Sequence, residues 1–267
     1  MKPQTSRAAK LTTALIAVTL CGSAVVGWGG EALASRPAAT GIAGLPATAI
    51  LTRSAAALNH ENTIAISGSM RLGNETIVLQ ISSTGRGKSV AGDIDIKTAG
   101  TNSGTVRFVD VGANVYLEAA LPFWKQELAS AGTGATGSSV AAVVLSKLAG
   151  RWIEISGSEA SSFSSSFGGL TEPGKFAQSL LAGNGTLIKG APRVLRGRRV
   201  LPISSSKGGT IYVSLTGAPL PIGIVGTQVA GGKTVTANVL FDYPATVTIN
   251  PPSGAVTLSQ IVKSLLG

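Results

Sequence analysis

The sequence predicts an α+β fold: a strongly curled antiparallel sheet, a half-barrel of about ten strands in two runs, with helices covering its concave face. Two stretches, residues 64–119 and 186–241, alternate apolar and polar residues as strands with one buried face do. Short turns rich in Gly and Asn separate consecutive strands, which makes neighbours antiparallel. A segment with helical spacing lies between the two stretches, and only helices can cover the apolar face of so wide a sheet.

Residues 1–34 are predicted to form a secretory signal peptide. Basic residues precede an apolar stretch at 11–26, and Ala32-Leu33-Ala34 offers small residues for cleavage before Ser35. The apolar stretch is too short for a typical membrane span. An alternative is lipidation of Cys21, although Leu20 before it matches a lipoprotein signal poorly, and a third outcome is an uncleaved anchor. We therefore expect an exported protein, either extracellular or held in the cell envelope.

The remaining chain divides into a tether and one domain. Residues 35–46 are rich in Pro, Gly and Ala and predict a flexible tether. Residues 47–267 are expected to form a single domain, which is long enough to bury a substantial core. Helical spacing of Ile50, Leu51, Ala55 and Leu58 predicts a first helix over about 45–59.

The first run of alternation predicts a meander of five strands. Its turns fall at 73–74, 84–87, 99–102 and 112–114. Polar residues such as Asp93 and Asp95 alternate with the apolar ones and are expected to face solvent. The apolar residues that share the inner face are Ile64, Ile66, Met70, Ile77, Leu79, Ile81, Ile94, Ile96 and Phe108.

The rest of the chain is predicted to contain helices, a loop and the second run of strands. Helices are expected at 123–128, 138–148 and 172–181, a short strand at 151–155, and a mobile loop over the Ser/Gly-rich residues 157–170. Strands are expected at 186–190, 191–204, 209–215, 220–227 and 233–241. A short amphipathic helix at 257–266 completes the chain.

Composition and motifs argue against an enzyme. The chain holds a single cysteine, Cys21, so the mature domain has neither disulfides nor thiolate metal sites. Residues 85–89 and 231–234 end like phosphate-binding loops but lack the required upstream glycine. Ser204 and Lys207 form an S-x-x-K in a turn, and His60 is the only histidine. No nucleophile, base and orienting group come together, and we expect no catalytic residues, cofactor or metal.

A basic run, Lys189 to Val200, stands out in a chain with only 13% charged residues and a formal net charge of +10. It contains Arg193, Arg196, Arg198 and Arg199. One interpretation is a solvated strand and turn; the other is a patch that contacts anionic lipid headgroups or the membrane surface. Nucleic acid is not expected as a partner, because the chain is exported and the run lacks interleaved aromatics. Adjacent strand residues point oppositely, so convergence requires a turn or bulge at Gly197.

Three phrases and the order of elements carry a family resemblance. They are "VGANVYL" leading to "PFW" at 111–124, "LAGRWIEI" at 148–155 and "YPATVTINPPSGAV" at 243–256. Over residues 45–262 the chain resembles the LppX/LprG family of actinobacterial lipoproteins, which share the half-barrel of the LolA/LolB lipid carriers. It departs from the family pattern in lacking a good lipobox. The resemblance implies a lipid-binding or lipid-transfer protein that holds acyl chains of an envelope lipid or glycolipid in an apolar cavity.

The inner-face residues given above, together with Trp124 and Trp152, are the expected lining of that cavity. Burial of acyl chains would drive binding by about 0.8 kcal/mol per CH₂. The alternative is a structural or interaction protein of the envelope whose own helices fill the concave face, through residues such as Ile50, Leu51, Val143, Leu145 and Leu148. The expected partners are an envelope lipid and an anionic membrane surface, and we expect a monomer.

Overall fold

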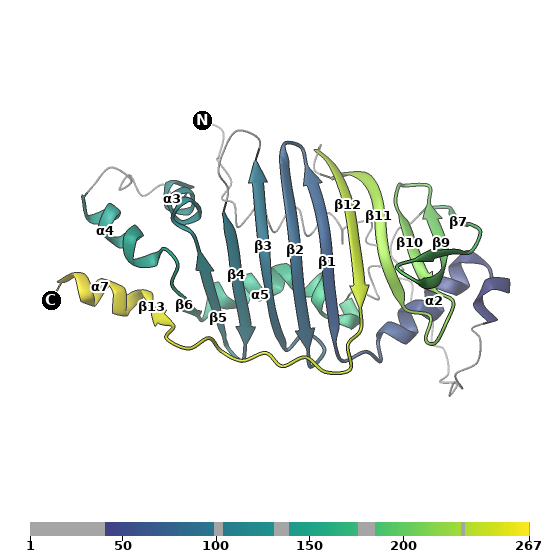
Figure 1. Ribbon diagram of the computed structural model, residues 1–267, viewed down its shortest axis with the longest axis horizontal. Helices are drawn as coiled ribbons and strands as arrows, with labels where there is room; N and C mark the ends of the chain where they lie inside the picture. Colours follow the sequence, from purple (N-terminus) through teal and green to yellow (C-terminus); the bar gives the residue numbers. More distant parts are fainter. Residues whose placement is uncertain (1–40, 99–103, 131–138, 176–184, 231–232, 267) are drawn as a thin grey trace.

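The computed structural model describes residues 41–266 apart from 99–103, 131–138, 176–184 and 231–232 (Figure 1). The predicted signal peptide, Cys21 and most of the predicted tether lie outside the described residues, as does most of the helix expected at 172–181. Within the predicted tether, Gly41–Gly44 forms a short 3-10 helix, η1, and buries Ile42.

The first run of strands forms the expected antiparallel meander. It comprises β1 (Ile64–Leu72), β2 (Glu75–Thr84), β3 (Ser89–Thr98), β4 (Thr105–Val111) and β5 (Asn114–Ala119). The next neighbour of β5 is β6 (Ile153–Ser156), and the short β13 (Val256–Thr257) pairs with β6 in parallel. The predicted return strand at 151–155 is thus confirmed, and β13 was not foreseen.

The second run of strands continues the same sheet from the other side of β1. Strand β12 (Lys233–Asp242) pairs with β1, followed by β11 (Pro221–Ala230), β10 (Thr210–Ser214) and β9 (Arg198–Ser205). The short strands β7 (Leu187–Lys189) and β8 (Arg193–Leu195) both pair with β9. The predicted strand 191–204 is interrupted at Arg196 and Gly197, whose positive φ angles of 49° and 74° make a tight hairpin turn.

The α+β class and the antiparallel sheet are confirmed, but the expectation of a strongly curled half-barrel is wrong. The 13-stranded sheet is open, with β13 and β7 at its two ends. Its strands lie side by side across the long axis of the molecule (Figure 1). The apolar surface is covered in separate packings at the centre and at both ends, so the sheet does not need to close around it.

The helices provide these separate packings. Helix α2 (Ala47–Leu58) packs Ile50 and Leu51 against β9 and β10. At the opposite end, α3 (Leu121–Ser130), α4 (Ser139–Leu148) and α7 (Leu258–Leu266) gather around β6. Helix α5 (Ser158–Thr171) lies behind the central strands (Figure 1). In the described part of the chain, no helix combines the length and apolar character needed to cross a membrane.

Helix α5 replaces the predicted mobile loop, and its own serines account for the difference. The hydroxyl groups of Ser161, Ser162 and Ser165 donate to backbone carbonyl groups four residues earlier, at 3.2, 2.9 and 2.8 Å. These bonds satisfy the serines within a helix, where they would otherwise favour turns. Ala160 and Phe163, one turn apart, supply the apolar contact that holds this helix on the sheet.

Candidate functional site

The apolar face of the sheet brings together nine residues expected to line a lipid cavity. The register aligns them in rows across the strands: Ile66 opposes Ile81, and Met70 opposes Ile77. All nine lie in one hydrophobic cluster, and none is more than 2% exposed. Their side chains therefore pack against the chain itself in this conformation. The nine are Ile64, Ile66, Met70, Ile77, Leu79, Ile81, Ile94, Ile96 and Phe108.

The two tryptophans expected in the cavity lie on opposite faces of the sheet. Trp124 is partly buried at one end of the apolar cluster, where its indole N–H donates to the Ala119 carbonyl oxygen at 3.2 Å. It also stacks edge-on against Phe123, with ring centroids 5.3 Å apart. Trp152 lies on the polar face, with the Arg107 guanidinium 5.8 Å from its ring centroid. The structure thus groups Trp124, but not Trp152, with the nine.

Helix α5 covers the centre of the apolar face. The rings of Phe163 and Phe108 meet edge-on, with centroids 5.4 Å apart. At the end of the helix, the buried Ser83 hydroxyl donates to the Thr171 carbonyl oxygen at 2.8 Å. Phe163 is only half-buried, so the described part of this helix offers one large side chain to the sheet.

A carboxyl group lies beside α5. Burial raises the pKa of Asp110 on β4, and a hydrogen bond with Ser164 of α5 lowers it by less. Burial therefore disfavours the charged form of this carboxyl group, and the contribution of Asp110 to the stability of the covered state falls as pH rises.

The polar face carries a groove that sequence reasoning missed. It has a volume of about 550 Å³ and is open to solvent along one side. Its floor is formed by β1 to β4, and part of its wall by the strap, defined here as residues 244–255 between β12 and β13. In Figure 1 the strap crosses the lower ends of the strands, on the side away from α5. The register between strands and the course of the strap together assemble this groove, so no local motif could have indicated it.

The strap is fixed at both ends. At its start, the Tyr243 hydroxyl donates to the Pro221 carbonyl oxygen at 2.7 Å, and Thr63 donates to the Pro244 carbonyl oxygen. Burial raises the pKa of Tyr243 well above its usual value, so this hydroxyl stays protonated. At its end, Val256 N–H donates to the Trp152 carbonyl oxygen at 3.0 Å. The groove wall is thus held in place against the sheet.

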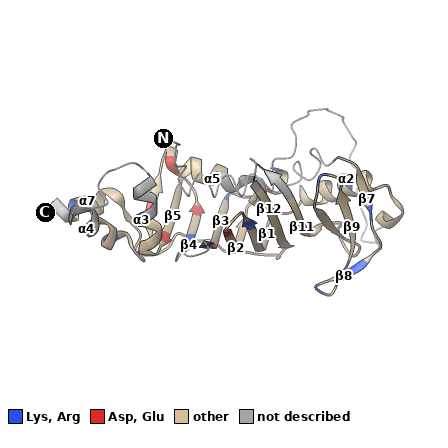
Figure 2. Cartoon of the chain, turned by 90° about the horizontal axis from the view of Figure 1, so that it is seen from above, with Lys and Arg blue, Asp and Glu red and all other residues tan. Residues whose placement is uncertain are grey.

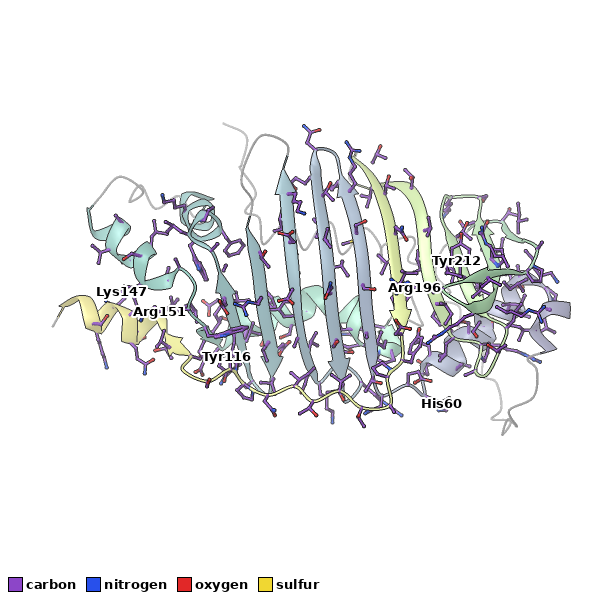
Figure 3. The ribbon with its side chains drawn as sticks, viewed as in Figure 1. His60, Tyr116, Lys147, Arg151, Arg196 and Tyr212 are labelled. Atoms are coloured by element: carbon purple, nitrogen blue, oxygen red, sulfur yellow. The ribbon has the colours of Figure 1, made fainter. Side chains whose placement is uncertain are left out.

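The arginines of the basic run divide between the two faces of the β8–β9 hairpin. Arg193 lies over the Tyr212 ring at 4.4 Å and donates to its hydroxyl at 2.6 Å, while Arg198 pairs with Asp242 at 3.2 Å. Arg196 is in the turn, and Arg199 opposes Val194 across the hairpin. The β8–β9 hairpin projects from the sheet in Figure 2, where its basic residues are blue, and Figure 3 labels Arg196 and Tyr212.

The residues considered and rejected for catalysis lie on separate elements. Ser204 is near the end of β9, where its hydroxyl is 2.9 Å from that of Thr210. His60 is exposed just after α2 (Figure 3). Among residues 41–266, omitting the gaps, no three His, Cys, Asp or Glu side chains cluster in a way that could hold a metal.

No known family model matches the chain, and no curated protein matches it. Among solved structures, it is similar to LprF from Mycobacterium bovis, with 12% identity and a TM-score of 0.48 over 78% of this chain and 97% of that one. It is also similar to an uncharacterized conserved protein from Thermus thermophilus, with 11% identity and a TM-score of 0.34 over 79% and 98% of the chains. The Pseudomonas aeruginosa MucA/MucB complex gives 13% identity and a TM-score of 0.30 over 80% and 60%.

Proposed function

We propose that the chain is an exported, non-enzymatic lipid-binding protein that carries acyl chains of an envelope lipid or glycolipid against the apolar face of its sheet, beneath α5. Export follows from the predicted signal peptide, by cleavage after Ala34 or by lipidation of Cys21. The observation that supports binding is a continuous apolar surface several strands wide, whose centre is covered by the single serine-rich helix α5.

The balance of energies favours exchange of this cover for an acyl chain. Serine is a weaker helix former than alanine by about 0.5 kcal/mol per residue, so α5 has little intrinsic stability. In the described part of α5, the half-buried Phe163 is the large apolar side chain that contacts the sheet, and this contact contributes about 2 kcal/mol. An acyl chain with about ten buried methylenes would contribute roughly 8 kcal/mol. Lipid could therefore displace the helix from the sheet while the strands stay paired.

A second candidate is a structural or interaction protein whose apolar face stays filled by its own helices. The near-complete burial of the nine apolar residues supports it. So do Ile50 and Leu51 at one end of the sheet and Leu148 at the other, which are already packed. Val143, also expected in this filling, is instead 45% exposed.

Approach to the envelope would use the β8–β9 hairpin. Val194 at its edge is 66% exposed, and Arg196 and Arg199 are exposed beside it. A basic side chain near an anionic surface contributes about 1 kcal/mol, and an exposed apolar side chain can insert among headgroups. Since Arg193 and Arg198 already have partners within the chain, the docking contribution is expected mainly from Arg196 and Arg199.

Native mass spectrometry after mild extraction tests the proposal. Lipid binding predicts adducts with the mass of an acyl lipid and displacement of a fluorescent fatty-acyl probe by that lipid. Phe163→Leu and Ser165→Leu are a matched pair of variants, because they place the same side chain on the inner and outer sides of α5. Probe affinity should change only in the first. A protein that emerges free of lipid and does not bind the probe is the self-filled alternative.

A further inference from the structure

The groove on the polar face has the composition of a ligand site. Its volume of about 550 Å³ falls within the range of roughly 300–1,000 Å³ found for small-molecule sites. It lies on the opposite face of the sheet from the proposed acyl site and is independent of that site.

One wall of the groove is a row of polar side chains set by strand register. Ser67 opposes Gln80, Gln80 opposes Asp93, and Asp93 opposes Arg107. Opposed residues lie about 5 Å apart, so the row presents hydroxyl, amide, carboxylate and guanidinium groups at regular intervals. This wall therefore holds both donors and acceptors, which suits a ligand that carries both.

The groove is deepest next to this row, because the side chains on its floor are small. Two positions further along the same three strands, Ala65 opposes Ser82, and Ser82 opposes Ala91. These residues, which share the polar face with the row, leave the depth that larger side chains would fill. A flat ligand can therefore reach the sheet surface between the row and the strap.

The other wall is apolar and comes from the strap and the chain before β6. Val247 and Ile249 are half-buried and line the groove, as does the half-buried Trp152. The backbone hydrogen bonds found among the described residues include none from residues 245–255 to the strands beneath. The backbone N–H and C=O groups of this wall are thus available to a ligand as well as to water.

We propose that the groove binds a neutral saccharide. A pyranose ring has hydroxyl groups around its edge and an apolar C–H face, and the groove offers a polar row opposite an apolar wall with an indole ring. Asp93 and Asp242 can each accept from neighbouring hydroxyls. Gln80 can donate, as can the guanidinium N–H groups of Arg107 that are not bonded to Glu118. The two carboxylates outnumber the one guanidinium in this lining, which disfavours an acidic sugar. The saccharide could be a free glycan or the headgroup of a glycolipid.

Titration with soluble tetrasaccharides, followed by tryptophan fluorescence and saturation-transfer NMR, tests this site. The panel is maltotetraose, mannotetraose and chitotetraose, with tetragalacturonate as the acidic comparison. We expect at least one neutral member to bind, with its C–H protons saturated and the acidic member inactive. Loss of the aromatic contact and of one charged hydrogen bond predicts that Trp152→Ala and Asp93→Asn each raise Kd about tenfold.

Matched variants separate this site from general effects on the fold. Trp152→Phe keeps an aromatic ring and should restore most of the affinity. Trp124→Phe on the apolar face and Asp95→Asn, two residues from Asp93 on the same strand, should leave Kd unchanged. No binding by any neutral tetrasaccharide, tighter binding of tetragalacturonate, or equal Kd for wild type and Trp152→Ala would each overturn the proposal.

A vesicle arm distinguishes the two sources of the sugar. Phosphatidylcholine vesicles are compared with and without a diglycosyl diacylglycerol. Groove binding of a headgroup predicts sedimentation with the glycolipid vesicles only, competed by the free tetrasaccharide and lost in Trp152→Ala. Binding of the tetrasaccharide without vesicle binding identifies a free glycan as the ligand. Failure of the acyl-chain proposal would leave both outcomes unchanged.

Discussion

Replacing Phe163 with alanine should loosen α5 while leaving the central strands in place. Full truncation of a buried phenylalanine costs about 3–5 kcal/mol, and Phe163 is half-buried against Phe108 at 5.4 Å between ring centroids. We therefore expect α5 to lose about 2 kcal/mol of its stability on the sheet. Since 1.4 kcal/mol is a factor of ten, opening of the helix should become about thirtyfold more frequent.

Hydrogen exchange measured by mass spectrometry provides the assay for this prediction. Peptides covering 158–165 should lose about thirtyfold of their protection, while peptides from β2 and β3 keep theirs because their cross-strand pairs are intact. Ser165→Ala, at an exposed position of the same helix, should not reduce protection. Unchanged protection of α5, or an equal loss in β2 and β3, would refute the view of α5 as a separately opening cover.

Three further changes have defined outcomes. Gly92→Ala should lower the free energy of unfolding in urea by about 1–3 kcal/mol, because the new Cβ would lie 2.5 Å from the Gln80 carbonyl oxygen. Gly44→Ala is the control, since it has open space around it and should leave the stability unchanged. Asp110→Asn should stabilise the protein at neutral pH. Because the pKa of Asp110 is raised in the folded protein, its contribution to the free energy of unfolding is fully favourable below the ordinary pKa of 3.8. That contribution is lost as pH rises through the raised pKa. The melting temperatures of wild type and Asp110→Asn should therefore converge on acidification. Arg196→Gln with Arg199→Gln should lower the affinity for anionic vesicles, measured by co-sedimentation at low salt, about thirtyfold. The same change at Arg193 and Arg198, which have partners within the chain, should lower it less.

The strands were predictable because their sequence pattern is local. In β3, Ile94 and Ile96 are buried while Asp93 is exposed and Asp95 pairs with Lys97 at 3.3 Å. Alternation of period two, bounded by Gly-containing turns, is sufficient to indicate such a strand and its inner face. The nine residues of the apolar face were identified in this way, although what they contact was not.

The errors come from features that are not local. The serines of α5 favour a loop when read alone, and contacts across the sheet, such as that between Phe163 and Phe108, stabilise the helix. The break at Arg196 required a non-glycine residue at positive φ. The sheet is not strongly curled because separate helices cover different parts of its apolar face, and this division cannot be read from any one segment.

The groove could not be predicted from the sequence for a related reason. Gln80, Asp93 and Arg107 are separated along the chain by 13 and 14 positions and align only through the registers of three strands. Trp152 was identified as a site residue, but it was assigned to the apolar face because the side on which a short return strand points its residues depends on its pairing with β5.

The most direct test of the central claim is to fix α5 to the sheet and measure acyl binding. Asp110→Cys with Ser164→Cys, in a Cys21→Ser background, places two thiols at neighbouring positions of β4 and α5. A short bis-thiol reagent then closes the pair, and closure is confirmed by mass. We predict that a fluorescent acyl probe binds the form without the cross-link and that cross-linking abolishes binding. Equal binding before and after cross-linking would contradict a site beneath α5.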